Sequence, residues 1–370
     1  MTEPQKNRPP LLRIEDLRTY FYSRVKRAFV RSVDGVDLEV VRGETLGIVG
    51  ESGSGKSVTM LSAMGLVTTG PGVITGRVTF NDGSPRELLE GLDSNVRLER
   101  RNGRIMRVSK DNQAWQKQAD RNLKGVRGGK ISMIFQNPRA ALNPFETVGR
   151  QIAEAVRLHT NVKNAAEARE KALHWLEEVR IDSPRLRFDN HPYGLSGGMS
   201  QRAMIAMALA AEPQVLIADE PTTGLDATIQ ARIVDLLDDL KARLGMTMVL
   251  ISHDIGVISR LSDRIAVMYG GRVMESGPAA SVLDERADGH PYTLALLSST
   301  PRPENVTASG HLPAIEGEVL DTLNVPAGCR YCARCQRIND SVRSLCQGQE
   351  PELFEIAPGR RIRCWLYAPK

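Results

Sequence analysis

The sequence predicts an α/β fold built around an open parallel sheet. Three short apolar runs, residues 46–49, 215–218 and 246–251, have the length and composition of strands buried on both faces. Each run ends at polar residues suited to phosphate or metal chemistry, and helical patterns follow the first two. Strands that alternate with helices, with such chemistry at the strand ends, are typical of this class.

The first run leads into a glycine-rich loop of the form G-x-x-x-x-G-K-S. Its residues are Gly50, Glu51, Ser52, Gly53, Ser54, Gly55, Lys56 and Ser57. The glycines allow tight turns that direct backbone N–H groups at phosphate oxygens, and the following helix points its positive end at the same anion. Lys56 is suited to neutralise the β- and γ-phosphates, and Ser57 to ligate Mg²⁺. A chance glycine-rich turn does not explain the strand before it and the helix after it, so we expect a nucleoside triphosphate site.

The other elements are predicted from periodicity and from capping residues. A disordered tail is expected at residues 1–10, strands at 11–17, 36–41, 76–81 and 131–135, and a hairpin at 265–275 broken at Gly270-Gly271. Helices are expected from residue 57 to about 66 and throughout residues 146–213. Asn164, Ser196 and Asp226 are the predicted N-caps, and Gly245 closes the helix that Asp226 begins.

Two stretches remain open to more than one interpretation. Among the aromatic residues Tyr20, Phe21 and Tyr22, Phe21 is the first candidate for stacking on a purine, and simple packing between strands is the alternative. Residues 84–130 carry 12 Lys/Arg against 6 Asp/Glu, which accounts for the net charge of +5 of the whole chain. A solvated basic insertion without a regular fold is expected there, apart from helical fragments at residues 111–123.

Strand ends supply the expected catalytic groups. Asp219 ends an apolar strand and can hold Mg²⁺ through water, and Glu220 stands one residue beyond it, where a carboxylate can act as general base on the attacking water. His253 follows another buried strand and can bond the γ-phosphate, whereas by itself it would be an ordinary surface histidine. Gln136 can reach Mg²⁺ and the water, or can be a plain loop residue.

The segment LSGGMSQR, residues 195–202, predicts a second anion site. A serine followed by two glycines at a helix start exposes N–H groups to an anion, as in the first loop. One chain cannot easily close both sites on one ATP. We therefore expect a dimer in which this helix end covers the γ-phosphate bound by the partner chain.

With these motifs the chain resembles the ABC transporter ATPases, specifically the oligopeptide/dipeptide-importer branch. The resemblance runs from Leu11 to the C-terminus and rests on GESGSGKS, IFQNP, LSGGMSQR, VLIADEP, TTGLDAT and ISHD, with HPYT at residues 290–293 and a cysteine-rich tail. It implies an ABC-type P-loop domain with a RecA-like parallel core, an antiparallel β subdomain and an α-helical signature subdomain. The implied boundaries are 1–10 for the tail, 11–285 for the ATPase domain, 137–212 for its helical subdomain and 286–370 for a small loop-rich extension.

The resemblance also implies roles for single residues. Lys56, Ser57, Gln136, Asp219, Glu220 and His253 keep the roles given above, and Val58 joins the ATP-binding loop. Ser196, Gly197, Gly198, Met199 and Gln201 match the signature that completes the partner's site. Asp226 matches the loop at the dimer seam, and Phe21 lies where the family stacks an aromatic ring on adenine.

The five cysteines are confined to the end of the chain, in the pattern C-x₂-C-x₂-C-x₁₀-C-x₁₇-C. Disulfides are not expected in a reducing cytoplasm, whereas zinc and an iron–sulfur cluster both suit four thiolates. The resemblance favours a [4Fe–4S] cluster on Cys329, Cys335, Cys346 and Cys364, with Cys332 as a spare thiol and zinc or no metal as alternatives.

Partners and location follow from the same resemblance. No apolar run is long enough for a transmembrane helix and no signal peptide is recognised, so a peripheral position on the cytoplasmic face of the bacterial inner membrane is expected. The implied partners are a second ATPase chain, different or identical, two permease subunits and, indirectly, a solute-binding protein. The cargo is a peptide or a similar solute, with a sugar, an opine or nickel as alternatives. A soluble ABC ATPase acting on nucleic acid, supported only by the basic insertion, and a P-loop kinase are weaker alternatives.

Overall fold

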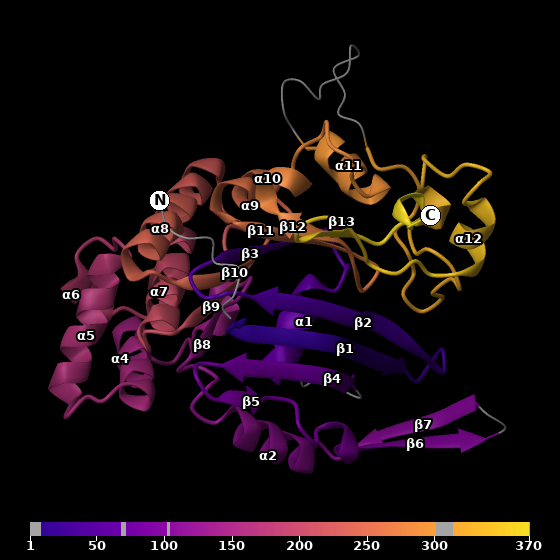
Figure 1. Cartoon of the computed structure of the whole chain (residues 1–370). Coiled ribbons are helices and arrows are strands. Elements are labelled where there is room, and N and C mark those ends of the chain that lie inside the picture. Colours follow the sequence, from indigo (N-terminus) through magenta and orange to yellow (C-terminus); the bar gives the residue numbers. More distant parts are fainter. Residues whose placement is uncertain (1–8, 68–71, 102–103, 301–313, 370) are drawn as a thin grey trace. The chain divides into compact units, whose positions relative to one another are not determined.

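The computed structural model describes residues 9–67, 72–101, 104–300 and 314–369, so the expected tail lies almost wholly outside the described residues. These residues fold as two compact units. Figure 1 labels their helices and strands. Within the described ranges, the first unit contains residues up to 41, residues 46–122 and residues from 253 onward. The second contains residues 42–45 and 123–252. No helix in the described ranges is both long and apolar enough to cross a bilayer.

The first unit contains an antiparallel sheet of four strands in the order β2-β1-β4-β5. Its strands are β1 (Leu12–Ser23), β2 (Ala28–Val40), β4 (Gly72–Asn81) and β5 (Pro85–Glu87). The predicted strands are present but longer, and β1 runs through the aromatic cluster instead of ending before it. Tyr22 pairs with Phe29 of β2, and their rings meet edge to face with centroids 5.3 Å apart. This cross-strand aromatic contact stabilises the extension of both strands.

A second sheet of the first unit carries the nucleotide loop. Its order is β13-β14-β12-β11-β3, formed by β3 (Thr45–Val49), β11 (Arg264–Tyr269), β12 (Arg272–Pro278), β13 (Phe354–Ala357) and β14 (Arg360–Ile362). β3 and β11 are parallel, whereas the β11–β12 hairpin turns at Gly270-Gly271 as predicted. The last two strands come from the C-terminal extension, which therefore continues this sheet in addition to forming loops.

The expectation of an irregular insertion at residues 84–130 is wrong. After β5 the chain forms β6 (Val96–Arg101) and β7 (Arg104–Lys110), an antiparallel ribbon, and then α2 (Asn112–Leu123), which confirms the predicted helical fragment (Figure 1). Although the segment is basic, it buries Leu88, Leu92 and Trp115, and Lys110 places its ammonium 3.6 Å from the centroid of the Trp115 ring. The sequence pattern did not reveal this fold, because neither the strand period nor the helix period of apolar residues extends over the whole segment.

Short helices complete the first unit. They are α1 (Lys56–Ala63), α9 (Ile255–Leu261), α10 (Ala279–Val282), α11 (Pro291–Ser298) and α12 (Arg343–Gly348), with single 3₁₀ turns η1 (Asp93–Asn95), η4 (Cys332–Arg334) and η5 (Trp365–Tyr367). The C-terminal elements η4, α12 and η5 carry or adjoin the cysteines.

The second unit contains three parallel strands in the order β10-β9-β8. They are β8 (Ile131–Ile134), β9 (Val215–Asp219) and β10 (Thr247–Ile251), and every residue of β9 and β10 is buried, as strands covered on both faces require. Its helices are α3 (Pro138–Ala141), α4 (Val148–His159), α5 (Ala165–Glu178), α6 (Pro184–Phe188), α7 (Gly197–Leu209) and α8 (Ala227–Leu244), with the 3₁₀ turn η2 (Pro192–Gly194).

Capping in the second unit agrees with the sequence analysis. The Asn164 side chain accepts a hydrogen bond from the Glu167 N–H (2.9 Å) at the start of α5. The Glu167 carboxylate in turn accepts from the Lys163 N–H (2.8 Å), so the predicted capping box forms one residue off its ideal register. Gly245 ends α8 in the left-handed conformation, with φ of 60°.

Candidate nucleotide-binding and hydrolysis site

The phosphate loop of the first unit connects β3 to α1. Gly55 is the N-cap of α1 and has φ of 100°, and a Cβ atom there would lie 2.3 Å from the Ser32 carbonyl oxygen. A Cβ atom at Gly50 would lie 2.1 Å from the Met268 carbonyl oxygen. Glycine is therefore required at both positions, because neighbouring backbone leaves no room for a side chain.

Donors of this loop point toward its own interior. The Lys56 ammonium, 5% exposed, donates to the carbonyl oxygens of Gly50 (2.7 Å) and Glu51 (3.0 Å). The Ser54 hydroxyl is buried and has no hydrogen-bond partner among the described residues. A buried hydroxyl without a partner, beside a buried cation at a helix start, suits a polyanion as ligand.

Glu51 in this loop is held by two residues of the C-terminal extension. Its N–H donates to the Tyr292 hydroxyl (2.8 Å), and its carboxylate accepts two hydrogen bonds from the Arg334 guanidinium (2.7 and 3.1 Å). Sequence reasoning did not find these contacts. The motif HPYT at residues 290–293 was a signal for Tyr292, but nothing in the sequence pattern distinguished Arg334 from the other arginines of the tail.

The strand-end residues of the second unit include the predicted general base. Asp219 ends β9 and is 5% exposed, and Glu220 follows with φ of 47°, an uncommon conformation for a residue with a side chain. The Glu220 carboxylate accepts hydrogen bonds from Gln136 Nε2 (2.8 Å) and from the Thr223 hydroxyl (2.8 Å), while its N–H donates to Ile251 O (2.9 Å). The structure thus brings Gln136 and Glu220 together, and it adds Thr223, which the sequence analysis missed.

The signature segment begins α7 in the second unit. The Ser196 hydroxyl accepts from the Met199 N–H (3.3 Å), so Ser196 is the N-cap and remains exposed. A Cβ atom at Gly198 would lie 2.9 Å from the Ile229 side chain, which explains a glycine where α7 and α8 approach. Asp226 caps α8 by accepting from the Ile229 N–H (3.0 Å). Gly197 and Gly198 are half-buried, and Gln201 is buried.

Two further candidates belong to the first unit. His253 is exposed and directly precedes Asp254, the N-cap of α9. Phe21 is half-buried on β1, opposite Val30 of β2 and Gly72 of β4. The roles of both residues, and of Ser57, Gln136 and Asp219 toward Mg²⁺, stay predictions.

The five cysteines are free thiols near the end of the chain, and Cys329, Cys346 and Cys364 are buried. Burial, followed by the neighbouring cysteines, raises the pKa of Cys329 to about 12 and that of Cys364 to about 11. Burial also raises the pKa of Cys332 and Cys346. Within the described ranges, no three His, Cys, Asp or Glu side chains are arranged to hold a metal ion, so the expected iron–sulfur cluster is not confirmed.

Comparison with known proteins agrees with this geometry. The family model described as ABC transporter matches residues 33–223, more than half of the chain, and the model described as oligopeptide/dipeptide transporter, C-terminal region, matches residues 274–341. A probable peptide ABC transporter ATP-binding protein of Sinorhizobium fredii is 43% identical over 96% of this chain and 94% of the relative. The oligopeptide transport ATP-binding protein AppD of Bacillus subtilis is 39% identical over 96% of this chain and 97% of its own.

Solved structures show the same fold. A dimeric bacterial ABC transporter cassette has a TM-score of 0.55 and 27% identity, covering 72% of this chain and 98% of the cassette. A post-hydrolysis form of that cassette, bound to ADP and Pi, has a TM-score of 0.55 and 25% identity over the same fractions.

A phosphate loop after a buried strand and carboxylates at the end of another suit a nucleotide-hydrolysing protein. The family match and the relatives show that the chain belongs to the ABC transporter family as an ATPase. Within that family it is an ATP-binding subunit of the oligopeptide/dipeptide group, because its matches extend through the C-terminal region.

Proposed function

We propose that this chain is the ATP-hydrolysing subunit of a bacterial importer of peptides or similar small solutes. The observation that carries the proposal is likeness over 96% of the chain to ATP-binding proteins named for peptide and oligopeptide transport, together with the C-terminal match at residues 274–341. A nucleic-acid-directed ABC ATPase is less favoured, because the match at residues 274–341 is to an oligopeptide/dipeptide transporter region.

Each nucleotide residue has a defined part in this proposal. Lys56 and the loop amides bind the phosphates, and Ser57 and Asp219 hold Mg²⁺ with Gln136. Glu220 removes a proton from the attacking water, and its bonds to Gln136 and Thr223 keep the carboxylate oriented. His253 contacts the γ-phosphate, and Phe21 stacks on the adenine ring.

A second ATPase chain completes each site. The N–H groups at the start of α7, beginning at Gly197, bind the partner's γ-phosphate, and Asp226 lies at the dimer seam. The cap that Ser196 provides supports this role, because it presents the helix end without covering it. The partner is either a second copy or a different ATPase chain.

The loop after α3 is the proposed contact with the permease subunits. Asn143 is fixed by Gln151, whose Oε1 accepts from the Asn143 N–H (2.9 Å) and whose Nε2 donates to Asn143 O (2.9 Å). Two residues later Phe145 is 87% exposed. A rigid loop that presents a bare phenyl ring suits a protein partner, and this supports the proposal that the ATPase binds permease subunits at the cytoplasmic face of the inner membrane.

The docking proposal is tested by Phe145→Asp. Co-purification with the permease subunits falls at least about tenfold, as for a buried aromatic anchor. Val25→Asp, at a residue 94% exposed in the β1–β2 turn, is the control and leaves co-purification unchanged. Equal recovery of both variants would remove the proposed contact.

For the cysteines we propose a metal centre on Cys329, Cys335, Cys346 and Cys364. Its support is the restriction of the cysteines to residues 329–364 and the backbone bond from the Cys329 N–H to Cys346 O (2.8 Å). A cluster would staple a segment with little regular structure. Iron and acid-labile sulfide analysis of anaerobically purified protein tests this, and protein that lacks iron, sulfide and zinc contradicts it.

Hydrolysis itself is tested by Glu220→Gln. ATP still binds and dimers accumulate, whereas turnover falls at least ~100-fold because the general base is lost. Glu170→Gln, at an exposed position of α5, is the matched control and retains turnover. Undiminished turnover in Glu220→Gln removes the assigned role. Uptake of labelled peptide, sugar, opine or nickel by cells carrying either variant then identifies the cargo class.

A further inference from the structure

The phosphate loop contains a carboxylate, which is unfavourable where a triphosphate must bind. Glu51 is the second residue of the loop, and its own carbonyl oxygen accepts a hydrogen bond from the Lys56 ammonium. An unpaired carboxylate beside the phosphates would repel them, since like charges at short distance destabilise each other. The loop is therefore expected to need a counter-charge at this position.

Arg334 supplies that counter-charge from the far end of the chain. It ends the turn η4 between Cys332 and Cys335, and its two terminal nitrogens bond both oxygens of Glu51, at 2.7 and 3.1 Å. The Arg334 side chain is 4% exposed and that of Glu51 is 22% exposed. A guanidinium stays charged at physiological pH, so the contact is an ion pair with two hydrogen bonds.

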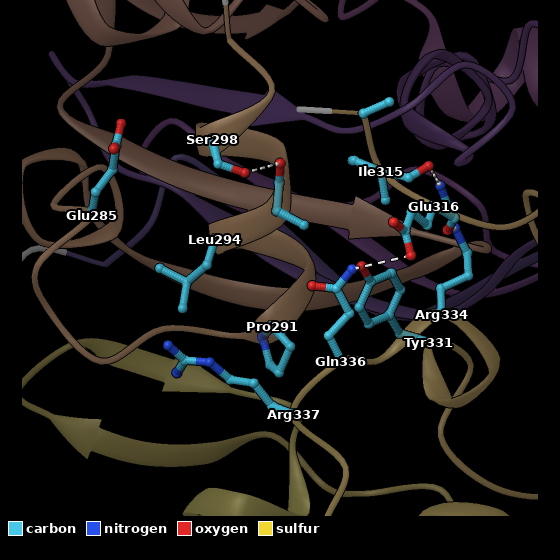
Figure 2. Close-up of a pocket in the computed structure, with 12 residues that line it drawn as sticks. Glu285, Pro291, Leu294, Ser298, Ile315, Glu316, Tyr331, Arg334, Gln336 and Arg337 are labelled. Atoms are coloured by element: carbon cyan, nitrogen blue, oxygen red, sulfur yellow. Dashed lines mark hydrogen bonds between the residues drawn. The ribbon is translucent and has the colours of Figure 1, made fainter. Parts of the chain in front are cut away.

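The remaining donors of Arg334 are also engaged, so its position is fixed. Nε donates to Glu316 O (2.9 Å) and Nη2 to Ile315 O (3.2 Å), while Nη1 also reaches the Tyr269 hydroxyl (3.3 Å). Figure 2 shows Arg334 beside Ile315 and Glu316 in the wall of a cavity of about 500 Å³. A guanidinium bound on three sides is not free to follow Glu51, so it holds the carboxylate in place.

The backbone of Glu51 is held by the same region. Its N–H donates to the Tyr292 hydroxyl (2.8 Å), and Tyr292 lies at the start of α11, fully buried against Tyr269 and Tyr331 with ring centroids 4.7 and 5.3 Å away. Burial raises the pKa of Tyr292, so the hydroxyl stays protonated. The main chain and the carboxylate of Glu51 thus both rest on residues beyond position 285.

We propose that Arg334 is a positioning residue for ATP: it neutralises Glu51 and keeps that carboxylate away from the phosphates, so that the cysteine-rich extension sets the nucleotide affinity of the phosphate loop. The inference rests on the proposed role of the loop. It gives the extension a function that does not depend on whether the cysteines bind metal.

Replacing Arg334 and replacing Glu51 should have different effects on ATP affinity. In Arg334→Gln the carboxylate is unmasked, and ATP affinity falls about 3- to 10-fold, with a smaller loss for ADP. In Glu51→Gln the arginine remains without a carboxylate, and ATP binds as tightly as in the wild type or more tightly. The double variant returns to within about twofold of the wild type, because no uncompensated charge is left.

Equilibrium binding of a fluorescent ATP analogue to the full-length chain measures these affinities. Arg337→Gln, an exposed arginine three positions along the same segment, is the matched control and leaves ATP affinity unchanged. If Glu51→Gln and Arg334→Gln lower ATP affinity equally, and the double variant does not recover it, the proposal is overturned. That result is expected of a contact that only stabilises the fold. Unchanged affinity in Arg334→Gln also overturns it.

Two further outcomes keep the test decisive. If Arg334→Gln does not fold, Glu51→Gln alone decides, and a loss of affinity greater than about threefold there overturns the proposal. If neither the wild type nor Lys56→Ala binds ATP, the assignment of the phosphate loop is wrong, and the proposal is wrong with it. If the wild type binds ATP and Glu51→Gln weakens binding as much as Arg334→Gln does, only the role of Arg334 is overturned.

Discussion

Replacing Arg360 tests how the C-terminal extension is attached to the sheet of the first unit. Arg360 lies on β14, and its Nε and Nη2 bond the same oxygen of Glu275 on β12, at 3.0 and 2.7 Å. Glu275 is fully buried, and its other oxygen accepts the His290 N–H (2.9 Å). In Arg360→Met the carboxylate loses its counter-charge in an interior that water does not reach.

The magnitude follows from that burial. Breaking a buried pair on one side costs about 3–5 kcal/mol of unfolding free energy, whereas an exposed pair contributes about 0–1 kcal/mol. At about 2–4 °C per kcal/mol, the melting temperature of Arg360→Met falls by about 6–20 °C. Replacing both partners, as Glu275→Leu with Arg360→Met, recovers most of the loss because no buried charge remains.

Thermal unfolding monitored by tryptophan fluorescence measures the effect, since Trp365 lies directly after β14. Arg13→Met is the matched control: Arg13 and Glu39 also pair across neighbouring strands (3.0 Å), but their side chains are 45% and 42% exposed. A melting temperature for Arg360→Met no lower than that of Arg13→Met would refute the assignment of a buried, stabilising pair.

Two other predictions concern pH and capping. Burial lowers the pKa of His290 in the folded chain to about 3, below the value of about 6.5 in the unfolded chain. As the pH falls below about 6.5, His290 takes up a proton in the unfolded chain but stays neutral in the folded chain. The free energy of unfolding therefore decreases by about 2 kcal/mol from pH 7 to pH 5. His290→Asn, which keeps an acceptor for the Tyr292 N–H, flattens this part of the pH profile of urea unfolding, and an unchanged slope contradicts the assignment. Ser196→Ala costs about 1 kcal/mol of cap energy and also weakens ATP-dependent dimerisation in sedimentation, whereas Asn164→Ala, the equivalent cap of α5, costs the same stability without affecting dimerisation. Equal dimerisation of these two cap variants would show that Ser196 has no part in the partner's site.

Much of the second unit could be predicted because its signals are local. Asn164, Ser196 and Asp226 each cap a helix by bonding an N–H only three residues ahead, so the sequence alone contains both partners. The buried strands β9 and β10 are apolar throughout and are likewise recognisable without a fold.

Residues 84–130 show why other parts could not be predicted. Their apolar side chains are divided between strands and a helix, and the Glu90 carbonyl oxygen accepts from Asn122 Nδ2 (2.8 Å) across 32 positions. Charge dominates the composition there, although Lys110 packs its ammonium on Trp115. A pattern of charge therefore predicted solvent exposure where contacts distant in sequence build a small core.

The chemistry of the nucleotide loop and of the strand ends is predicted by the sequence itself, because glycine spacing, a lysine and carboxylates after apolar runs act through neighbours in the chain. Only the tertiary structure decided that Glu51 is paired with Arg334, 283 positions away, and that Glu220 is held by Gln136, 84 positions away. A charge acquires its counter-charge through space, so the fold and not the local sequence decides which partner each carboxylate has.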